Sequence, residues 1–213
     1  MIEIIPAILE KDFYSVQKRV SQAEKYFKIA QIDITDGKFV YNQTFNDSVK
    51  FLKLVSNIDL EMHLMIDKPE KNWEKWAKHE RVKRIVFHAE VASNPEKLID
   101  EIKKKGKEVG IALNPPTDEK FLIQLVDQLD LVLILGVNPG FAGQEFIPTV
   151  LDKIRNIRNY SHKVNIACDG GVKLDNVVAM VNAGVNIIVT NTLIFKDDNI
   201  EENLSQLRKL VGR

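Results

Sequence analysis

Eight short apolar segments, separated by longer amphipathic ones, constrain the fold of this chain more than any other feature of its sequence. Most of these segments are rich in Ile and Val and show little alternation of polar and apolar residues. Such runs are typical of strands that are buried on both faces, as in parallel sheets. The predicted strands are Glu3–Leu9, Ile29–Thr35, Leu60–Ile66, Arg84–His88, Glu108–Leu113, Leu129–Leu135, Lys163–Cys168 and Asn186–Thr190.

The segments between the predicted strands have the pattern of amphipathic helices. Within Asp12–Phe27, apolar residues recur at steps of three and four, and charged residues take the other positions. Asn94 and Pro95 suit the N-cap and first position of a helix over Glu96–Lys105. Eight strands, each followed by a helix, predict an α/β fold: a single closed (β/α)₈ barrel (TIM barrel) over residues 1–213. The alternative, an open doubly wound sheet, usually has only about five or six strands.

The composition excludes several classes of partner. Thirty basic residues balance thirty acidic ones, so no net charge attracts the chain to nucleic acid or to a membrane surface. No apolar run approaches the roughly 20 residues that cross a bilayer, and the N-terminal segment reaches charged residues too early for a signal peptide. Cys168 is the only cysteine, which excludes an internal disulfide and favours a cytoplasmic protein.

Three polar residues interrupt or end the predicted strands where a barrel places its functional groups, at the C-terminal ends. Asp33 lies near the end of the second strand, and Asp169 follows the seventh. His63 lies within the otherwise apolar third strand. Each could be an ordinary hydrogen-bonded core group, but three of them at one barrel mouth favour a functional site.

Other polar residues near strand ends carry weaker signals. His88 and Glu90 close the fourth strand and are candidates for groups that support the site. Asp36 precedes a glycine and is equally well explained as a turn residue. His79 and His162 fall in predicted helix or loop regions, so we expect both at the surface.

Glycine-rich junctions follow the last three predicted strands. Glycine at a strand-to-helix junction allows backbone N–H groups to approach an anion closely. The loops after the last strands of such barrels often bind phosphate. The residues that we expect in this phosphate site are Gly140, Phe141, Ala142, Gly143, Gly170, Gly171, Asn191 and Thr192.

These segments resemble the ribulose-phosphate 3-epimerase family along almost the whole chain. The most specific match is Val-Asn-Pro-Gly-Phe-Ala-Gly-Gln-Glu-Phe, residues 137–146. The motifs also occur in the family's order, which makes chance similarity implausible. The other matching segments are Ile5–Leu9, Asp33–Val40, His63–Met65, Ala112–Pro115 and Asp169–Val172.

The resemblance implies a ribulose-phosphate-binding barrel that interconverts D-ribulose 5-phosphate and D-xylulose 5-phosphate by inversion at C3. It assigns Asp33 and Asp169 as the catalytic pair, one acting as base and the other as acid. It implies a divalent ion (Zn, Mn, Fe or Mg) that stabilises an enediolate, with Asp33, His63 and Asp169 as ligands. His63 and Met65 would also contact the substrate, a small phosphorylated sugar. Family members commonly form homo-oligomers.

Four positions depart from the family pattern near the predicted mouth. Gln31 stands where the family has a second histidine ligand, and an amide oxygen is a poorer ligand for zinc than imidazole. Ala7 replaces a serine that contacts the substrate, Thr35 a methionine that lines the site, and Asn191 a glycine of the phosphate loop. These changes favour an epimerase with weak or absent metal binding. They leave open an epimerase of another ketose phosphate, such as a hexulose phosphate, and a catalytically silent barrel that binds sugar phosphate.

Overall fold

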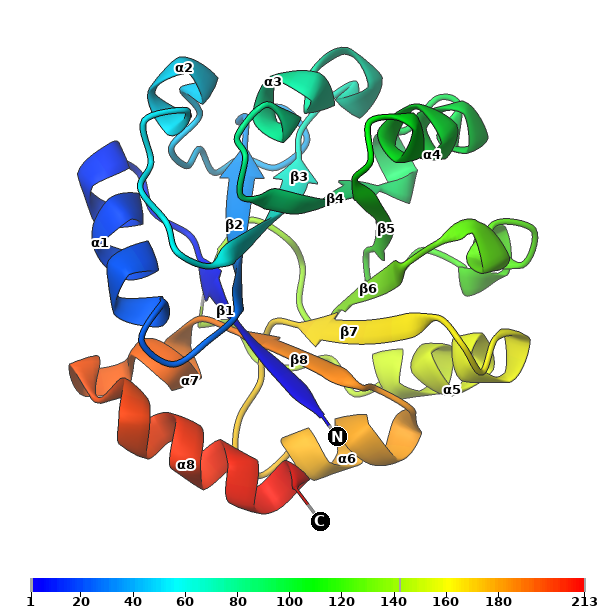
Figure 1. Cartoon of the computed structure of the whole chain (residues 1–213). Helices are drawn as coiled ribbons and strands as arrows, with labels where there is room; N and C mark the ends of the chain where they lie inside the picture. Colours follow the sequence, from blue (N-terminus) through cyan, green and yellow to red (C-terminus); the bar gives the residue numbers. More distant parts are fainter. Residues whose placement is uncertain (1, 142, 213) are drawn as a thin grey trace.

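The computed structural model describes residues 2–141 and 143–212, and within them eight parallel strands form a closed ring (Figure 1). Each strand pairs with its neighbours in the sequence, and the last strand closes the ring by pairing with the first. The predicted (β/α)₈ barrel is therefore confirmed. The strands are β1 (Glu3–Ile8), β2 (Ile29–Thr35), β3 (Asp59–Met65), β4 (Val82–His88), β5 (Glu108–Leu113), β6 (Leu131–Leu135), β7 (Asn165–Asp169) and β8 (Ile187–Thr190).

Helices lie outside the ring and cover the strands (Figure 1). Asp12 caps α1 by accepting a hydrogen bond from Ser15 N at 2.9 Å, and Asn94 caps α4 in the same way, as predicted. The helices are α1 (Phe13–Ala23), α2 (Ser48–Phe51), α3 (Trp73–Ala77), α4 (Pro95–Lys104), α5 (Val150–Tyr160), α6 (Val177–Ala183), α7 (Thr192–Phe195) and α8 (Ile200–Val211).

The prediction of an α-helix after every strand is wrong for β5. Between β5 and β6 the chain forms two short 3₁₀ segments, Glu119–Leu122 and Val126–Gln128. Pro115 and Pro116 follow the strand directly and cannot donate backbone hydrogen bonds. The turns that follow close through i to i−3 bonds, such as Leu125 N to Leu122 O at 2.9 Å.

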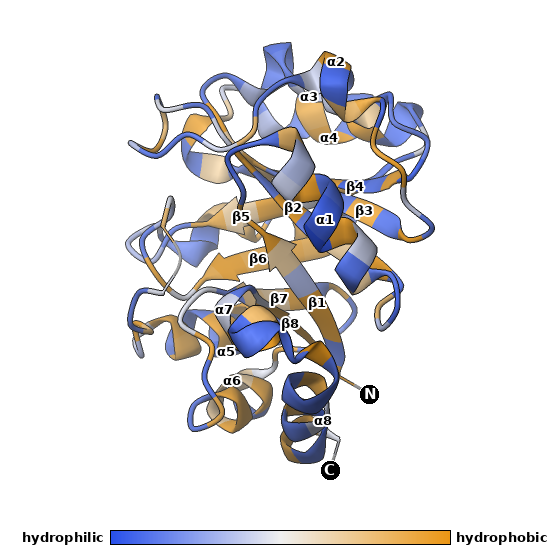
Figure 2. Ribbon diagram, turned by 90° about the vertical axis from the view of Figure 1, so that its left-hand side faces the viewer, coloured by the Kyte–Doolittle hydropathy of each residue, from blue (hydrophilic) through white to orange (hydrophobic). Residues whose placement is uncertain are grey.

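Apolar side chains pack on both faces of the barrel wall. One buried cluster joins the outward side chains of the strands, Ile32 and Ile34 among them, to the surrounding helices. A second, smaller cluster includes Ile5, Leu133 and Val189 and fills the barrel interior. The strands are accordingly mainly hydrophobic, with most of their polar positions in β2, β3 and β4, whereas the helices carry both hydrophobic and hydrophilic positions (Figure 2).

Within the residues that the structure describes, no helix has the length and apolar character needed to cross a membrane.

Polar side chains enter the barrel interior mainly from β2, β3 and β4. Arg84 lies between two carboxylates: its Nη1 is 2.6 Å from Glu61 Oε2, and its Nη2 is 2.8 Å from Glu108 Oε2. Glu61 is fully buried, and burial raises the pKa of its carboxyl despite the charge of Arg84. On β3, Glu61 precedes His63 by two residues, so this charged layer lies directly below the groups at the barrel mouth.

Candidate functional site

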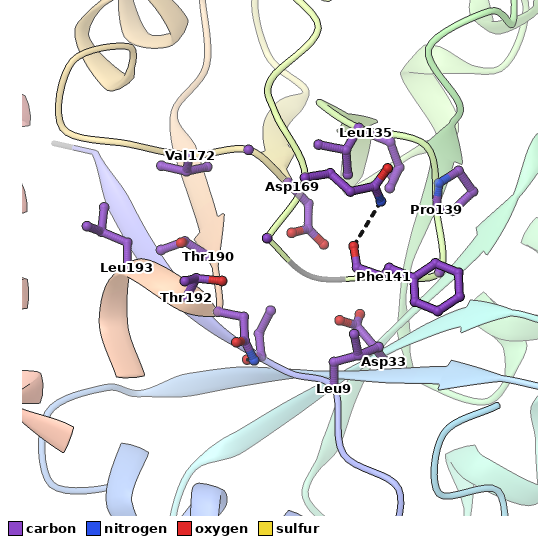
Figure 3. Close-up of a pocket in the computed structure, with 18 of the residues that line it drawn as sticks. Leu9, Asp33, Leu135, Pro139, Phe141, Asp169, Val172, Thr190, Thr192 and Leu193 are labelled. Carbon is purple, nitrogen blue, oxygen red and sulfur yellow. Dashed lines mark hydrogen bonds between the residues drawn. The ribbon is translucent and has the colours of Figure 1, made fainter. Parts of the chain in front are cut away.

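A cavity of about 230 Å³ opens at the C-terminal ends of the strands. Asp33 at the end of β2 and Asp169 at the end of β7 line it, and their carboxylates point into it (Figure 3). Ala142 lies outside the described residues. The other predicted residues that line the cavity are Met65, Gly140, Phe141, Gly143, Gly170, Gly171, Asn191 and Thr192.

Gln31 links the two aspartates. Its Nε2 donates to Asp33 Oδ1 at 2.8 Å and to Asp169 Oδ2 at 2.7 Å, and it lies 3.4 Å from His63 Nδ1. Gln31 and His63 are both fully buried and do not line the cavity; they lie beneath its floor. His63 is therefore placed behind Asp33, where it contacts the carboxylate from outside the cavity.

The sequence pattern predicted Gln31 to be a weak ligand through its amide oxygen, but the structure turns the nitrogen toward the carboxylates. The oxygen, Gln31 Oε1, is buried without a hydrogen-bond partner among the described residues. An unpaired buried acceptor of this kind costs about 1–3 kcal/mol. Gln31 Nε2 donates instead to two carboxyl groups that share negative charge, and a hydrogen bond to an ionised acceptor is stronger than one between neutral groups. These two hydrogen bonds explain why the amide takes this orientation.

A chain of hydrogen bonds leads away from Asp33 through two stacked imidazoles. His63 Nδ1 lies 2.9 Å from Asp33 Oδ1, and His63 Nε2 lies 2.9 Å from His88 Nε2. His88 Nδ1 lies 3.2 Å from Glu90 Oε2. Because the carboxylates at both ends accept, all three bonds form together only when the two rings carry three N–H hydrogens. This chain therefore favours one imidazolium, and it confirms that His88 and Glu90 lie behind the site.

The environment of each ring indicates which one holds the charge. Burial alone would lower the pKa of His63, but the hydrogen bond and charge of Asp33, together with the charge of Asp169, outweigh it and raise that pKa. Burial lowers the pKa of His88 to about 4, against the opposing effect of Glu90. These opposite shifts favour His63, beside the two aspartates, as the ring that carries the extra proton.

Asp169 differs from an ordinary aspartate in its proton affinity. Burial, followed by the charge of Asp33, raises the pKa of Asp169 to about 7. Like charges held close together cannot both ionise easily, so one proton is retained on the pair near neutral pH. Such an arrangement provides one proton donor and one proton acceptor at a single site.

Asp33, His63 and Asp169 form a group that could hold a metal ion, since one ligand atom of each lies within 4.8 Å of the others. The Gln31 NH₂ group lies among these atoms, however, and an NH₂ group cannot bind a cation. An ion at ligand distances of about 2.0–2.2 Å from the same atoms would press against its hydrogens. With the amide in this orientation, the residues do not fit a divalent ion.

The opposite wall of the cavity is made by the loops after β6 and β7, which pack against each other. Gly171 has a φ of +67°, and a Cβ there would lie 2.6 Å from the Cα of Phe146, so only glycine fits. Gln144 Nε2 donates to the carbonyl oxygens of Asn138, at 2.6 Å, and Phe141, at 2.9 Å; the second bond is drawn in Figure 3. Side chains thus hold the shape of this wall.

The remaining departures from the family pattern have different structural roles. Ala7 lines the cavity as expected. Asn191 has a φ of −93°, which needs no glycine, and its Nδ2 donates to Ala7 O at 2.9 Å. Thr35 is not among the described residues that line the cavity. It exchanges two hydrogen bonds with Thr44, and the Thr44 hydroxyl donates to the carbonyl oxygen of Asp33, so this pair fixes the backbone that carries the carboxylate.

Two exposed lysines that line the cavity were missed in the sequence. Lys173 follows β7 and Lys196 follows α7, both near the predicted phosphate loops. Their positions after the Gly-Gly and Asn-Thr junctions could have indicated that they lie at the cavity. Lysines are so common at protein surfaces, however, that these positions alone do not distinguish them. Figure 3 shows that apolar side chains, including Leu9, Val172 and Leu193, surround the rest of the cavity.

Four other residues singled out in the sequence lie away from the chemistry. Asp36 accepts hydrogen bonds from backbone N–H groups, including Asp67 N at 2.9 Å, which supports its interpretation as a turn residue. Cys168 is buried. His162 is exposed as predicted, but the prediction for His79 is wrong. His79 is buried, and its ring nitrogen forms a hydrogen bond with the carbonyl oxygen of Leu54 at 2.9 Å. The two residues are 25 positions apart, so the sequence pattern did not indicate this contact.

Comparison of the sequence with known proteins shows which family this chain belongs to. The ribulose-phosphate 3 epimerase family matches residues 3–195. The chain is 32% identical to ribulose-phosphate 3-epimerase of Bacillus subtilis, over 98% of this chain and 99% of that protein. It is 34% identical to the enzyme of the same name from Synechocystis, over 97% of this chain and 93% of that protein.

Solved structures with low sequence identity share the fold. A 3-hexulose-6-phosphate synthase superposes with a TM-score of 0.71 at 15% identity, covering 99% of this chain and 100% of that one. A tryptophan synthase alpha-subunit from Pyrococcus furiosus gives 0.72 at 15% identity, with 100% of both chains covered. These two likenesses concern the barrel alone. The sequence match across nearly the whole chain is more specific, and by it the protein belongs to the ribulose-phosphate 3-epimerase family.

Proposed function

We infer that this chain is an epimerase that inverts C3 of a ketose phosphate, with D-ribulose 5-phosphate and D-xylulose 5-phosphate as its substrates. The observation that carries this proposal is the placement of Asp33 and Asp169 on different strands, facing one cavity and held by one Gln31 nitrogen. Two such carboxyl groups can remove a proton from one face of a carbon and return one to the other. The names of the relatives support the choice of substrate.

The two aspartates have different proposed roles. Asp169, whose pKa is raised to about 7, holds a proton near neutral pH and acts as the acid. Asp33 accepts hydrogen bonds from Gln31 and His63 and acts as the base. Proton removal beside the substrate carbonyl gives an enediolate, and in the reverse direction the aspartates exchange roles. A divalent ion has no part in this mechanism, because the Gln31 amide fills the place between the ligand atoms.

The phosphate group of the substrate is proposed to bind at the glycine-rich wall. Gly170 and Gly171 both have positive φ, which brings backbone N–H groups close to the cavity without side chains in between. Lys173 and Lys196 add positive charge at its rim, where a phosphate dianion would be attracted. This arrangement supports a substrate with phosphate at one end and its reacting carbon over the aspartates.

Proton exchange followed by NMR tests the proposal. The protein is mixed with D-ribulose 5-phosphate in D₂O, and we expect deuterium at C3 together with D-xylulose 5-phosphate. Asp33→Asn and Asp169→Asn should each slow exchange by about 10²–10⁴-fold. Asp152→Asn, at an exposed position on α5, is the matched control and should keep full activity. Exchange only with a hexulose phosphate would favour that alternative substrate, and binding without exchange would favour the silent barrel.

A further inference from the structure

We propose that the side-chain amide of Gln31 replaces a divalent ion in this site, so that the chain aligns its two aspartates without a metal. The inference rests on the proposed function, because it concerns how the acid and base of that reaction are held. Its basis is the position and direction of one NH₂ group.

The position of Gln31 Nε2 matches what an ion would need. It lies within 2.8 Å of an oxygen of both aspartates and 3.4 Å from His63 Nδ1. The bond to Asp33 stays within β2, whereas the bond to Asp169 crosses the barrel to β7. One buried group therefore links the two sides of the site, which is the structural task of an ion bridging two carboxylates.

The direction of the amide shows which of its ends the site prefers. An amide has the same shape in either orientation, but only its nitrogen donates hydrogen bonds. Here both N–H bonds point at carboxylates, although this leaves Oε1 buried without a partner among the described residues. In the nitrogen-inward orientation Gln31 offers no ligand atom toward the space between the carboxylates, and its N–H bonds occupy that space instead.

The arrangement also suits the proposed chemistry. An aspartate oxygen that only accepts a hydrogen bond keeps a lone pair free to take up a proton. Gln31 and His63 supply the donors that offset the repulsion between Asp33 and Asp169. In this description Gln31 is a positioning residue: it acts on the substrate only through the aspartates that it holds.

The test combines metal binding with activity on the full chain. Metal content of the purified protein is measured by mass spectrometry, and Co²⁺ binding is followed by its visible absorption. C3 exchange is measured after EDTA treatment and again after addition of Zn²⁺, Mn²⁺ or Co²⁺. We expect the natural protein to contain no stoichiometric metal, to show no Co²⁺ spectrum and to keep its activity in EDTA.

Two variants at the same position give the converse result. Gln31→Glu keeps the shape of the side chain but replaces the NH₂ group by oxygen, and Gln31→His supplies an imidazole. Each should bind Co²⁺ at least about 10-fold more tightly than the natural protein. Each should also lose activity about 10²-fold in EDTA and recover it when metal is added. Thermal melts confirm that both variants are folded.

The outcomes separate this inference from the proposed function. One equivalent of bound metal in the natural protein, with activity lost in EDTA and restored by Zn²⁺ or Mn²⁺, would overturn the inference and leave the epimerase standing. If no protein exchanges the C3 proton under any condition, the proposed function fails. The Co²⁺ titrations still decide the inference in that case, because they need no substrate.

Discussion

The proposed reaction needs one proton on the pair of Asp33 and Asp169, whichever direction it runs. One aspartate must be ionised to accept a proton while the other donates one. Because burial and then the charge of Asp33 raise the pKa of Asp169 to about 7, the pair loses this proton at higher pH. We expect kcat/KM to fall about tenfold per pH unit above neutrality, with either sugar phosphate as substrate. A rate that stays constant to about pH 9 in one direction would contradict this assignment.

The same residue should lower the stability of the fold. The carboxyl of Asp169 has a pKa of about 3.9 in the unfolded chain and of about 7 in the folded chain. The free energy of unfolding therefore decreases as the pH rises between these two values. Asp169→Asn removes the ionisable group and keeps an oxygen for the Gln31 N–H. We expect this variant to be more stable than the natural protein at pH 8, by up to about 4 kcal/mol, and by less at pH 5. Urea unfolding at both pH values measures the difference; a gain that is independent of pH would argue against the shifted pKa.

The sequence was sufficient to predict the position of a polar residue where that residue lies in an otherwise apolar, buried strand. Asp33 and His63 interrupt buried strands and Asp169 ends one, so their convergence at the mouth followed from strand periodicity. The direction of the Gln31 amide did not, because its two ends differ only in what they meet across the barrel. The pair of Thr35 and Thr44 was equally hidden, since it depends on how one loop returns to its own strand.

The loops after β6 and β7 depend on each other, and one glycine tests this contact. Gly171→Ala would place a Cβ 2.6 Å from the backbone of Phe146, in addition to the strain of its positive φ. Gly37→Ala has similar strain, with a φ of +74°, but its Cβ would meet nothing within 4 Å. We expect Gly37→Ala to cost about 1–2 kcal/mol in urea unfolding and Gly171→Ala clearly more. Only Gly171→Ala should also raise KM, and equal effects of the two variants would show that the loops shift freely.

Strands were predicted to within two residues because a buried parallel strand is a continuous apolar run, a pattern that few elements of the same length share. Helices were less certain, since packing against the barrel decides how far each one extends. The segment after β5 shows the limit: Leu122 and Val126 are spaced as in a helix and both are buried, yet the chain forms 3₁₀ turns there.

A cytoplasmic location and a homo-oligomer stay predictions.

The barrel as a whole is divided into a polar and an apolar side. Interior side chains of β2, β3 and β4 form two polar groups: Arg84 with Glu61 deeper in the barrel, and Asp33 with His63 at the mouth, two residues further along β3. Interior side chains of β6 and β8 are mainly aliphatic. The proposed catalytic groups therefore lie above a buried charged layer, whose integrity should matter to the stability of the whole molecule.

Removing the cation from this layer should be more damaging than removing a whole ion pair. Arg84→Met would leave Glu61 as a buried carboxylate without its ion-pair partner, and we expect a loss of about 3–5 kcal/mol in urea unfolding. Glu108 tolerates the change because it is partly exposed and lies 3.2 Å from Lys83 Nζ. The double variant Glu61→Leu/Arg84→Met buries no charge and should lie within about 1 kcal/mol of the natural protein. The deficit of Arg84→Met should shrink at low pH, where Glu61 takes up a proton. A double variant as unstable as the single one would mean that Arg84 stabilises the barrel through packing and not through its charge.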